Sequence, residues 1–178
     1  MSPLDATVVS MFGWDLRLDY ATHRRHSLVR RFIKTAIGFL ILGLCVGGWL
    51  VVRRELFGRP PSAYEVSAHT HLILVGFVMT MILGVALWLF PRPDKNDRRY
   101  RPALVGVAYW LLTAGTFVRA ASEWWHDSAS GAWLPRLQWL IVTSSMLQIA
   151  ALVLFFATMW SRIRGIGSRD REARGERF

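Results

Sequence analysis

Four long runs of apolar residues, separated by short charged segments, account for most of the chain. The runs cover residues 32–52, 66–90, 103–122 and 133–160. A helix needs about 20 consecutive, mostly apolar residues to cross the hydrocarbon core of a bilayer. A transmembrane barrel would instead show short segments in which apolar and polar residues alternate. The pattern therefore predicts an all-α fold, an integral multi-pass four-helix bundle in contact with the lipid bilayer.

The segments outside the runs divide the chain into three regions. Residues 1–29 carry scattered apolar positions and are compatible with a cytoplasmic segment that forms a short interfacial helix. Residues 30–161 make up the membrane domain. Residues 162–178 are highly charged and have too few apolar residues for a core, so we expect a cytoplasmic tail.

Basic residues are distributed unequally between the two ends of the expected bundle. The segment through Lys34, the loop 91–102 and the tail from Ser161 hold 17 of the 22 Lys and Arg residues. Cytoplasmic loops are enriched in Lys and Arg. We therefore expect both termini inside (N-in, C-in), in the cytoplasmic (inner) membrane of a prokaryote.

Composition narrows the chemistry of the chain. The formal net charge is +10 over 178 residues, but the basic residues lie in clusters between apolar runs, so nucleic acid is not an expected partner. Cys45 is the one cysteine and lies within an apolar run, which excludes disulfide frameworks and cysteine-based metal centres. Any metal chemistry must use the five histidines.

Two of these histidines, His69 and His71, lie near the start of the second run. On a helix that turns by about 100° per residue, the face beneath His69 holds Gly76, Thr80 and Gly84, which form a narrow groove. The face beneath His71 is bulky and aliphatic, suited to lipid or an apolar helix. Because the two rings point to nearly opposite sides, we do not expect them to share a metal ion.

The spacing leaves two interpretations of His69 open. An imidazole above a glycine-lined groove suits an axial ligand, because a flat macrocycle must approach the helix closely. Alternatively, both histidines lie at a helix end near the membrane surface, and the glycines serve helix packing alone.

The stretch AHTHLILVGF (residues 68–77), followed by Gly84 and Pro91, resembles the second transmembrane helix of heme-copper oxidase and nitric oxide reductase catalytic subunits. It is especially similar to short four-span proteins related to their subunit I. In the large enzymes, the histidine of this helix is an axial ligand of the low-spin heme. The resemblance implies that role for His69, with heme b as the cofactor, while His71 matches the second histidine of the short relatives.

The chain departs from the complete enzymes in its number of histidines. Those enzymes need further histidines on later helices for the second heme and for copper, whereas the remaining histidines here lie outside the predicted spans: His23, His26 and His126. We expect no copper and no binuclear centre. Whether the chain contributes to an enzyme as one component of an oxidoreductase stays open.

Several other side chains are candidates for the heme environment. Arg53, Arg54 and Arg119 lie at the depth of His69 and could hold heme propionates, or could reach to the membrane surface as isolated cations. His126 could be a second axial ligand, or a residue of the tryptophan-rich interface. The second axial position could also be filled by a partner subunit, or stay open for nitric oxide or oxygen.

Self-association would also complete the coordination, because a symmetry mate could contribute its own His69 or His71. A Gly43-x-x-x-Gly47 motif in the first run favours close helix approach and is compatible with a homo-oligomer. The sequence thus predicts a membrane heme protein for electron transfer in a respiratory chain or for gas binding. The alternative is a heme-free accessory or assembly subunit of a respiratory oxidase or reductase.

Overall fold

The computed structural model describes residues 3–90, 102–163 and 175, with side chains described from Ser27 onward. Within these ranges the chain forms helices and short connections, and no strand. Four of its helical segments are long and apolar enough to cross a membrane, which confirms the predicted fold class. The side of the membrane on which the termini lie stays a prediction.

In chain order the helices are α1 (Pro3–Phe57), α2 (Ala63–His71), η1 (Leu72–Met79), α3 (Thr80–Leu89), α4 (Pro102–His126), α5 (Trp133–Met159) and η2 (Trp160–Arg162).

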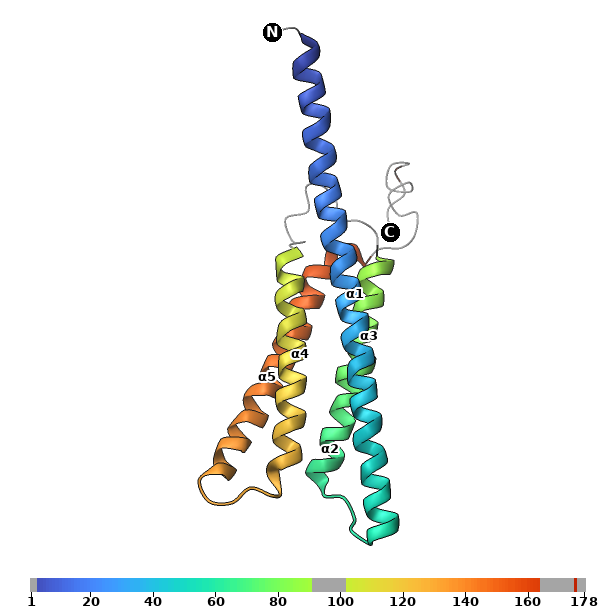
Figure 1. Ribbon diagram of the computed structural model, residues 1–178. Coiled ribbons are helices and arrows are strands. Elements are labelled where there is room, and N and C mark those ends of the chain that lie inside the picture. The colour runs from blue at the N-terminus through green and yellow to red at the C-terminus, as the bar shows by residue number, and fades with distance from the viewer. Residues whose placement is uncertain (1–2, 91–101, 164–174, 176–178) are drawn as a thin grey trace.

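The second span consists of three segments, α2, η1 and α3, which follow one another without a break (Figure 1). The segment η1 is a π-helix, in which each turn is wider than in an α-helix. The Thr80 hydroxyl donates to the carbonyl of Val75 across this wider turn, at 3.0 Å.

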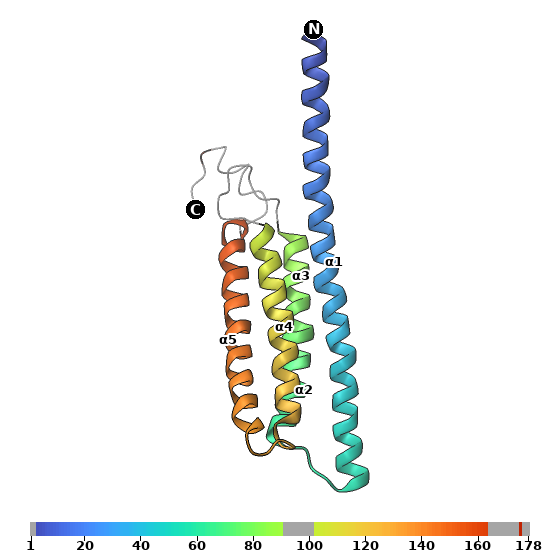
Figure 2. The ribbon, with the colours of Figure 1, turned by 60° about the vertical axis from the view of Figure 1, so that its left-hand side comes forward.

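Two of the predicted apolar runs lie within longer helices, and the second span begins at Ala63 rather than at residue 66. The helix α1 continues without a break from Pro3, so the expected interfacial helix is continuous with the first span, and it projects past the rest of the bundle (Figure 2). The helix α4 ends at His126 rather than at residue 122. Glu123 is accommodated in its last turns because Ser67 and Arg119 both donate to one oxygen of its carboxylate.

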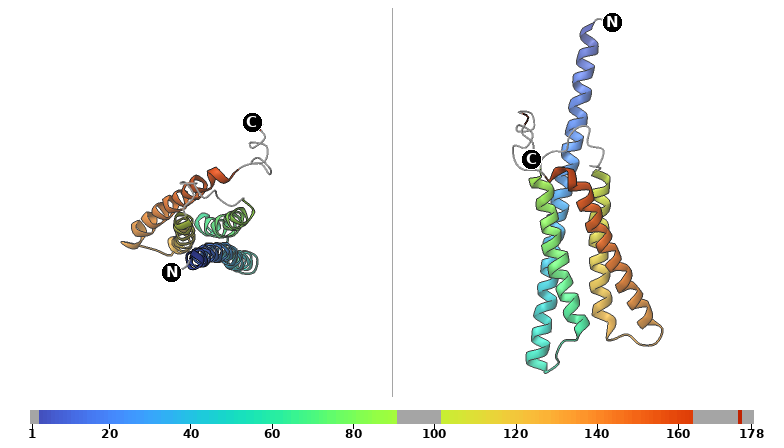
Figure 3. Two further views of the ribbon diagram at one scale, coloured as in Figure 1. Left: turned by 90° about the horizontal axis from the view of Figure 1, so that it is seen from above. Right: turned by 180° about the vertical axis from the view of Figure 1, so that it is seen from behind.

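The helices pack as two antiparallel pairs (Figure 3). One pair joins α1 to the second span, and the other joins α4 to α5. The helix α4 also contacts α2, so it connects the pairs. We call the end at which α2 begins and α4 ends the histidine end, and the opposite end, where α4 begins, the basic end.

The core is larger toward the basic end. Phe32 of α1 is fully buried there and meets Tyr109 and Phe155 edge to face, at centroid distances of 5.0 and 6.0 Å. The Tyr109 hydroxyl also bonds the Thr35 hydroxyl of α1, at 2.7 Å. Many large apolar side chains point outward, such as Trp88 at 67% exposure, as expected for an integral membrane protein whose surface contacts lipid.

Candidate functional site

The start of α2 is held by a capping box. The Ser62 hydroxyl accepts from the backbone of Glu65 at 3.2 Å, and the Glu65 carboxylate accepts from the backbone of Ser62 at 2.8 Å. Both oxygens of that carboxylate also accept from the guanidinium of Arg53. This ion pair fixes the beginning of α2 against the end of α1.

His69 lies against α1 rather than in open space. Its Nδ1 is 3.0 Å from the carbonyl oxygen of Gly43. Since a carbonyl only accepts, Nδ1 carries the proton and Nε2 keeps its lone pair. A Cβ atom at Gly47 would lie 2.6 Å from the ring carbon Cε1, so this position of the ring depends on a glycine there.

Gly76 and Gly84 face the same helix as His69, but the face they form is covered. A Cβ at Gly76 would lie 2.7 Å from Cγ of Phe39, and one at Gly84 would lie 2.8 Å from Cβ of Phe32. The small residues therefore admit aromatic side chains of α1. In this structure, the glycine face serves helix packing.

His71 faces α4. Its Nδ1 is 2.8 Å from the carbonyl oxygen of Ser67 and 3.4 Å from a carboxylate oxygen of Glu123. Glu123 is almost fully buried. The face beneath His71 was expected to meet lipid or an apolar helix, whereas the ring itself meets a buried carboxylate.

Glu123 is the centre of a polar network at the histidine end. Its Oε1 accepts from the Ser67 hydroxyl at 2.9 Å and from Arg119 Nε at 3.0 Å. The guanidinium of Arg119 also donates to the hydroxyl of Ser145 on α5, at 2.6 Å. The network thus connects α2, α4 and α5 through groups that would be costly to bury alone.

Each arginine predicted near the heme is paired with a carboxylate of this chain. Arg53 binds Glu65, Arg119 binds Glu123, and the exposed Arg54 lies 3.1 Å from its neighbour Glu55. To hold heme propionates, the half-buried Arg53 and Arg119 would have to exchange these partners.

His126 lies in the last turn of α4 and stacks on Tyr64 of α2, with ring centroids 3.6 Å apart. Its Nδ1 is 3.3 Å from Asp127, and its buried Nε2 has no hydrogen-bond partner among the described residues. The pKa of Asp127 lies below its ordinary value because the hydroxyl of Ser62 donates to the carboxylate, and His126 adds to the effect.

The predicted glycine motif of α1 faces the second span. Gly43 packs against Ile73 and Leu72 of the second span, so the Gly43-x-x-x-Gly47 surface lies inside the bundle. On α5, the side chain of Gln148 donates to Thr116 of α4 at 3.1 Å.

Comparison with known families agrees with this architecture. The family described as Cytochrome C and Quinol oxidase polypeptide I matches residues 27–172. The chain belongs to this family. The resemblance found at the second helix is therefore confirmed, and the match extends over all four spans. No curated protein and no solved structure matches the chain.

As a subunit I-like membrane protein, the chain fits a heme only in part. His69 presents the tautomer that an axial ligand needs, but α1 covers the expected seat of the macrocycle over Gly76 and Gly84. In the described ranges, no three His, Cys, Asp or Glu side chains converge as a metal site. A heme would therefore be held by His69 with ligands or contacts from outside the α1–α2 interface.

Sequence reasoning missed Glu123 and Glu65. A signal for Glu123 was present: it stands four residues after Arg119, the spacing of a helical ion pair, at the edge of an apolar run. A carboxylate at that position is costly unless it is paired, and therefore indicates a partner.

Proposed function

We propose that this subunit I-like membrane protein binds heme b through Nε2 of His69 and acts in electron transfer or gas binding. The observation that carries the proposal is the hydrogen bond between His69 Nδ1 and the carbonyl of Gly43. Histidines that ligate metals commonly donate their other ring nitrogen to a carbonyl or carboxylate, which sets the tautomer and the ring orientation. When bound, the heme would supply an iron that accepts one electron or a diatomic gas.

The α1 helix has two tasks in this proposal. The Gly43 carbonyl keeps the proton on Nδ1, and Gly47 leaves room for the ring to lie against the helix. The family match adds support, since members of this family usually bind heme. The proposal does not depend on Gly76 or Gly84.

The second axial position is expected to come from outside this bundle or to stay open. His71 is engaged with Ser67 and Glu123. His126 has an unpartnered Nε2 among the described residues, but its ring is stacked on Tyr64, whereas His69 lies against α1. A second copy of the chain or another respiratory subunit could supply the ligand. With a second ligand the protein would transfer electrons, and without one it would bind nitric oxide or oxygen.

A visible spectrum of the detergent-solubilised protein, oxidised and then reduced, tests the proposal. His69→Ala should lose the Soret band, because it removes the ligand. The matched control is His71→Gln, which keeps a side chain able to donate to Glu123 and should retain heme. Full heme content in His69→Ala would contradict the assignment.

Nitric oxide added to the reduced protein distinguishes electron transfer from gas binding, because nitric oxide binds readily to a heme with an open position.

The proposed location is the cytoplasmic membrane of a prokaryote, with both termini inside. A cysteine introduced at Asn96, in a background that carries Cys45→Ser, should resist an impermeant thiol reagent in intact cells, whereas one at Ser130 should react. Labelling of residue 96 in intact cells would reverse the orientation.

A second candidate function is a heme-free accessory or assembly subunit. The packing of Phe39 on Gly76 and of Phe32 on Gly84 favours it, because the bundle closes without a cofactor. A colourless protein that co-purifies with a respiratory complex would select this function. The spectrum described above separates it from the first proposal.

A further inference from the structure

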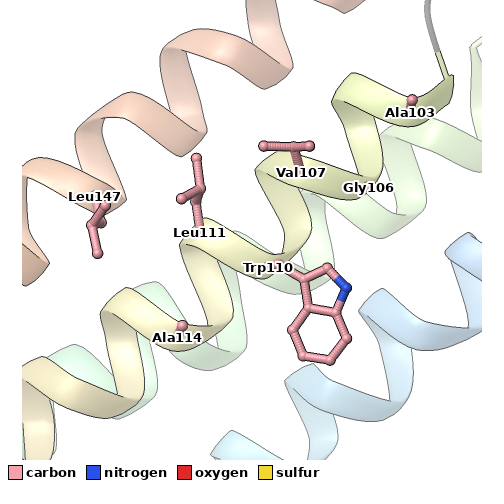
Figure 4. Close-up of a pocket in the computed structure, with 7 residues that line it drawn as sticks. All are labelled: Ala103, Gly106, Val107, Trp110, Leu111, Ala114 and Leu147. Atoms are coloured by element: carbon pink, nitrogen blue, oxygen red, sulfur yellow. The ribbon is translucent and has the colours of Figure 1, made fainter.

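An apolar groove of about 520 Å³ lies along the outer side of α4, between α1 and α5 (Figure 4). Ala103 marks its beginning near the basic end, and Ala114 and Leu147 lie further along it. Trp110 projects from α4 toward α1 and is 61% exposed. The groove is separate from the histidines and from the polar network around Glu123.

The floor of the groove contains a glycine that no side chain covers. A Cβ atom at Gly106 would meet nothing within 4 Å, in contrast to the tight contacts at Gly47, Gly76 and Gly84. These three glycines admit side chains of this chain. Gly106 leaves space that the bundle itself does not use.

The helix register places two cations of α1 at the level at which the groove begins. The helices α1 and α4 run in the same direction, and the Thr35–Tyr109 hydrogen bond sets their register. Arg31 lies one turn before Thr35 on the same face, about 6 Å along the axis. This places Arg31 at the level of the first residues of the groove, and Lys34 follows it three residues later. Both side chains are exposed, and no described carboxylate pairs with them.

The size of the groove discriminates between occupants. A transmembrane helix is at least 10 Å wide, so a segment as long as Ala103–Ala114 would occupy more than about 1,200 Å³. All of the empty space in the groove, including the part that is open to its surroundings, is about 830 Å³, which is smaller than that volume. An extended hydrocarbon chain is narrower, and phosphate is the group in the bilayer that complements two cations at the membrane surface.

We propose that this groove holds one acyl chain of an anionic phospholipid, whose phosphate pairs with Arg31 and Lys34. The lipid would fill the space over Gly106 and separate α1 from α5 along the exposed side of α4. This inference does not depend on heme binding.

Native mass spectrometry of the full chain, in micelles that contain equal amounts of phosphatidylglycerol and phosphatidylcholine with the same acyl chains, tests the proposal. The wild type should retain one phosphatidylglycerol per chain in preference to phosphatidylcholine. One basic residue near an anionic surface changes binding roughly fivefold, so the double variant Arg31→Gln, Lys34→Gln should lower that preference by about tenfold or more. The control, Arg59→Gln with Arg136→Gln, removes the same charge at the histidine end and should keep the preference.

A second pair of variants tests the groove itself. Gly106→Leu fills the floor without a clash and should lower the binding of both lipids. Gly48→Leu also adds a side chain where nothing lies within 4 Å, but on α1 away from the groove, and should have no effect. Circular dichroism checks that each variant is folded.

Three results would overturn the proposal: equal retention of the two lipids by the wild type, unchanged retention in Gly106→Leu, or a loss in the control variants equal to that in the test variants.

A cysteine introduced at Ala114, in the Cys45→Ser background, tests whether a second copy of the chain occupies the groove instead. Efficient disulfide-linked dimerisation in the bilayer would place a second copy of the chain in the groove and would also refute the lipid.

Discussion

His69 and His71 are separated by one residue on α2, yet they have different partners. His69 lies on α1 and bonds a backbone carbonyl, whereas His71 lies toward α4 beside a buried carboxylate. A carbonyl orients an imidazole without a net charge and leaves the other nitrogen available as a ligand. A carboxylate that also binds Ser67 and Arg119 ties its imidazole into a structural network.

The difference shows how one short helix can serve two purposes. The His69 side depends on glycines that bring two backbones together, and the His71 side depends on buried charges that must remain paired. Substitutions on the first side should therefore act chiefly on the ligand, and substitutions on the second side on the stability of the bundle.

The largest expected effect on stability is that of Glu123→Ala. The substitution leaves Arg119 without its carboxylate and removes the partners of Ser67 and His71, and breaking a buried ion pair costs about 3–5 kcal/mol. Denaturant unfolding in detergent measures this change. The matched control is Glu55→Ala, which removes an exposed pair and should cost less than about 1 kcal/mol. Equal losses in the two variants would show that the network does not stabilise the bundle.

A smaller effect is expected from Gly47→Ala. The added Cβ would lie 2.6 Å from the ring of His69, so the ring must move away from the Gly43 carbonyl, at a cost of about 1–3 kcal/mol. Heme content should fall, and the electron paramagnetic resonance signal of any remaining heme should change. Gly48→Ala adds the same atom to the next residue, where nothing lies within 4 Å, and should leave both quantities unchanged. A normal spectrum in Gly47→Ala would mean that α1 does not position the ligand.

A weaker pH effect is expected at Asp127, which follows the third histidine at this end and accepts a hydrogen bond from Ser62. The pKa of Asp127 is lowered in the folded chain, so its ionised form stabilises the fold above the ordinary range of an aspartate. This contribution is lost as the pH falls through the lowered pKa. Unfolding measured from pH 6 down to about pH 3 should show a slightly shallower decline in Asp127→Asn than in the wild type. Identical pH profiles would refute this contribution.

The different partners of His69 and His71 predict that these two histidines do not bind copper. Because their rings face different helices, they cannot converge on one ion, and stoichiometric copper is not expected in the isolated chain. Elemental analysis of the purified protein, combined with oxygen-consumption measurements in the presence of a reductant, checks this. One copper per chain with sustained turnover would contradict the assignment of separate tasks to His69 and His71.

The sequence by itself determined the parts of the protein that depend on local pattern. The length of each apolar run predicted a membrane-spanning helix, since the bilayer imposes a minimum length on any helix that crosses it. The positions of His69 and His71 on one helix predicted that their rings diverge. The residues of the second run also indicated the family, which the match over residues 27–172 confirms.

The tertiary structure decided which neighbour each face meets. The small face with Gly76 and Gly84 was predictable, but whether a cofactor or Phe39 and Phe32 approach it depends on helices far apart in the chain. The same holds for Arg53, whose partner Glu65 is contributed by the following helix. Such pairings arise because distant segments must together satisfy buried charges and fill the space between helices. The residue pattern of one helix shows which of its residues need a partner, but it does not identify the residues that they contact.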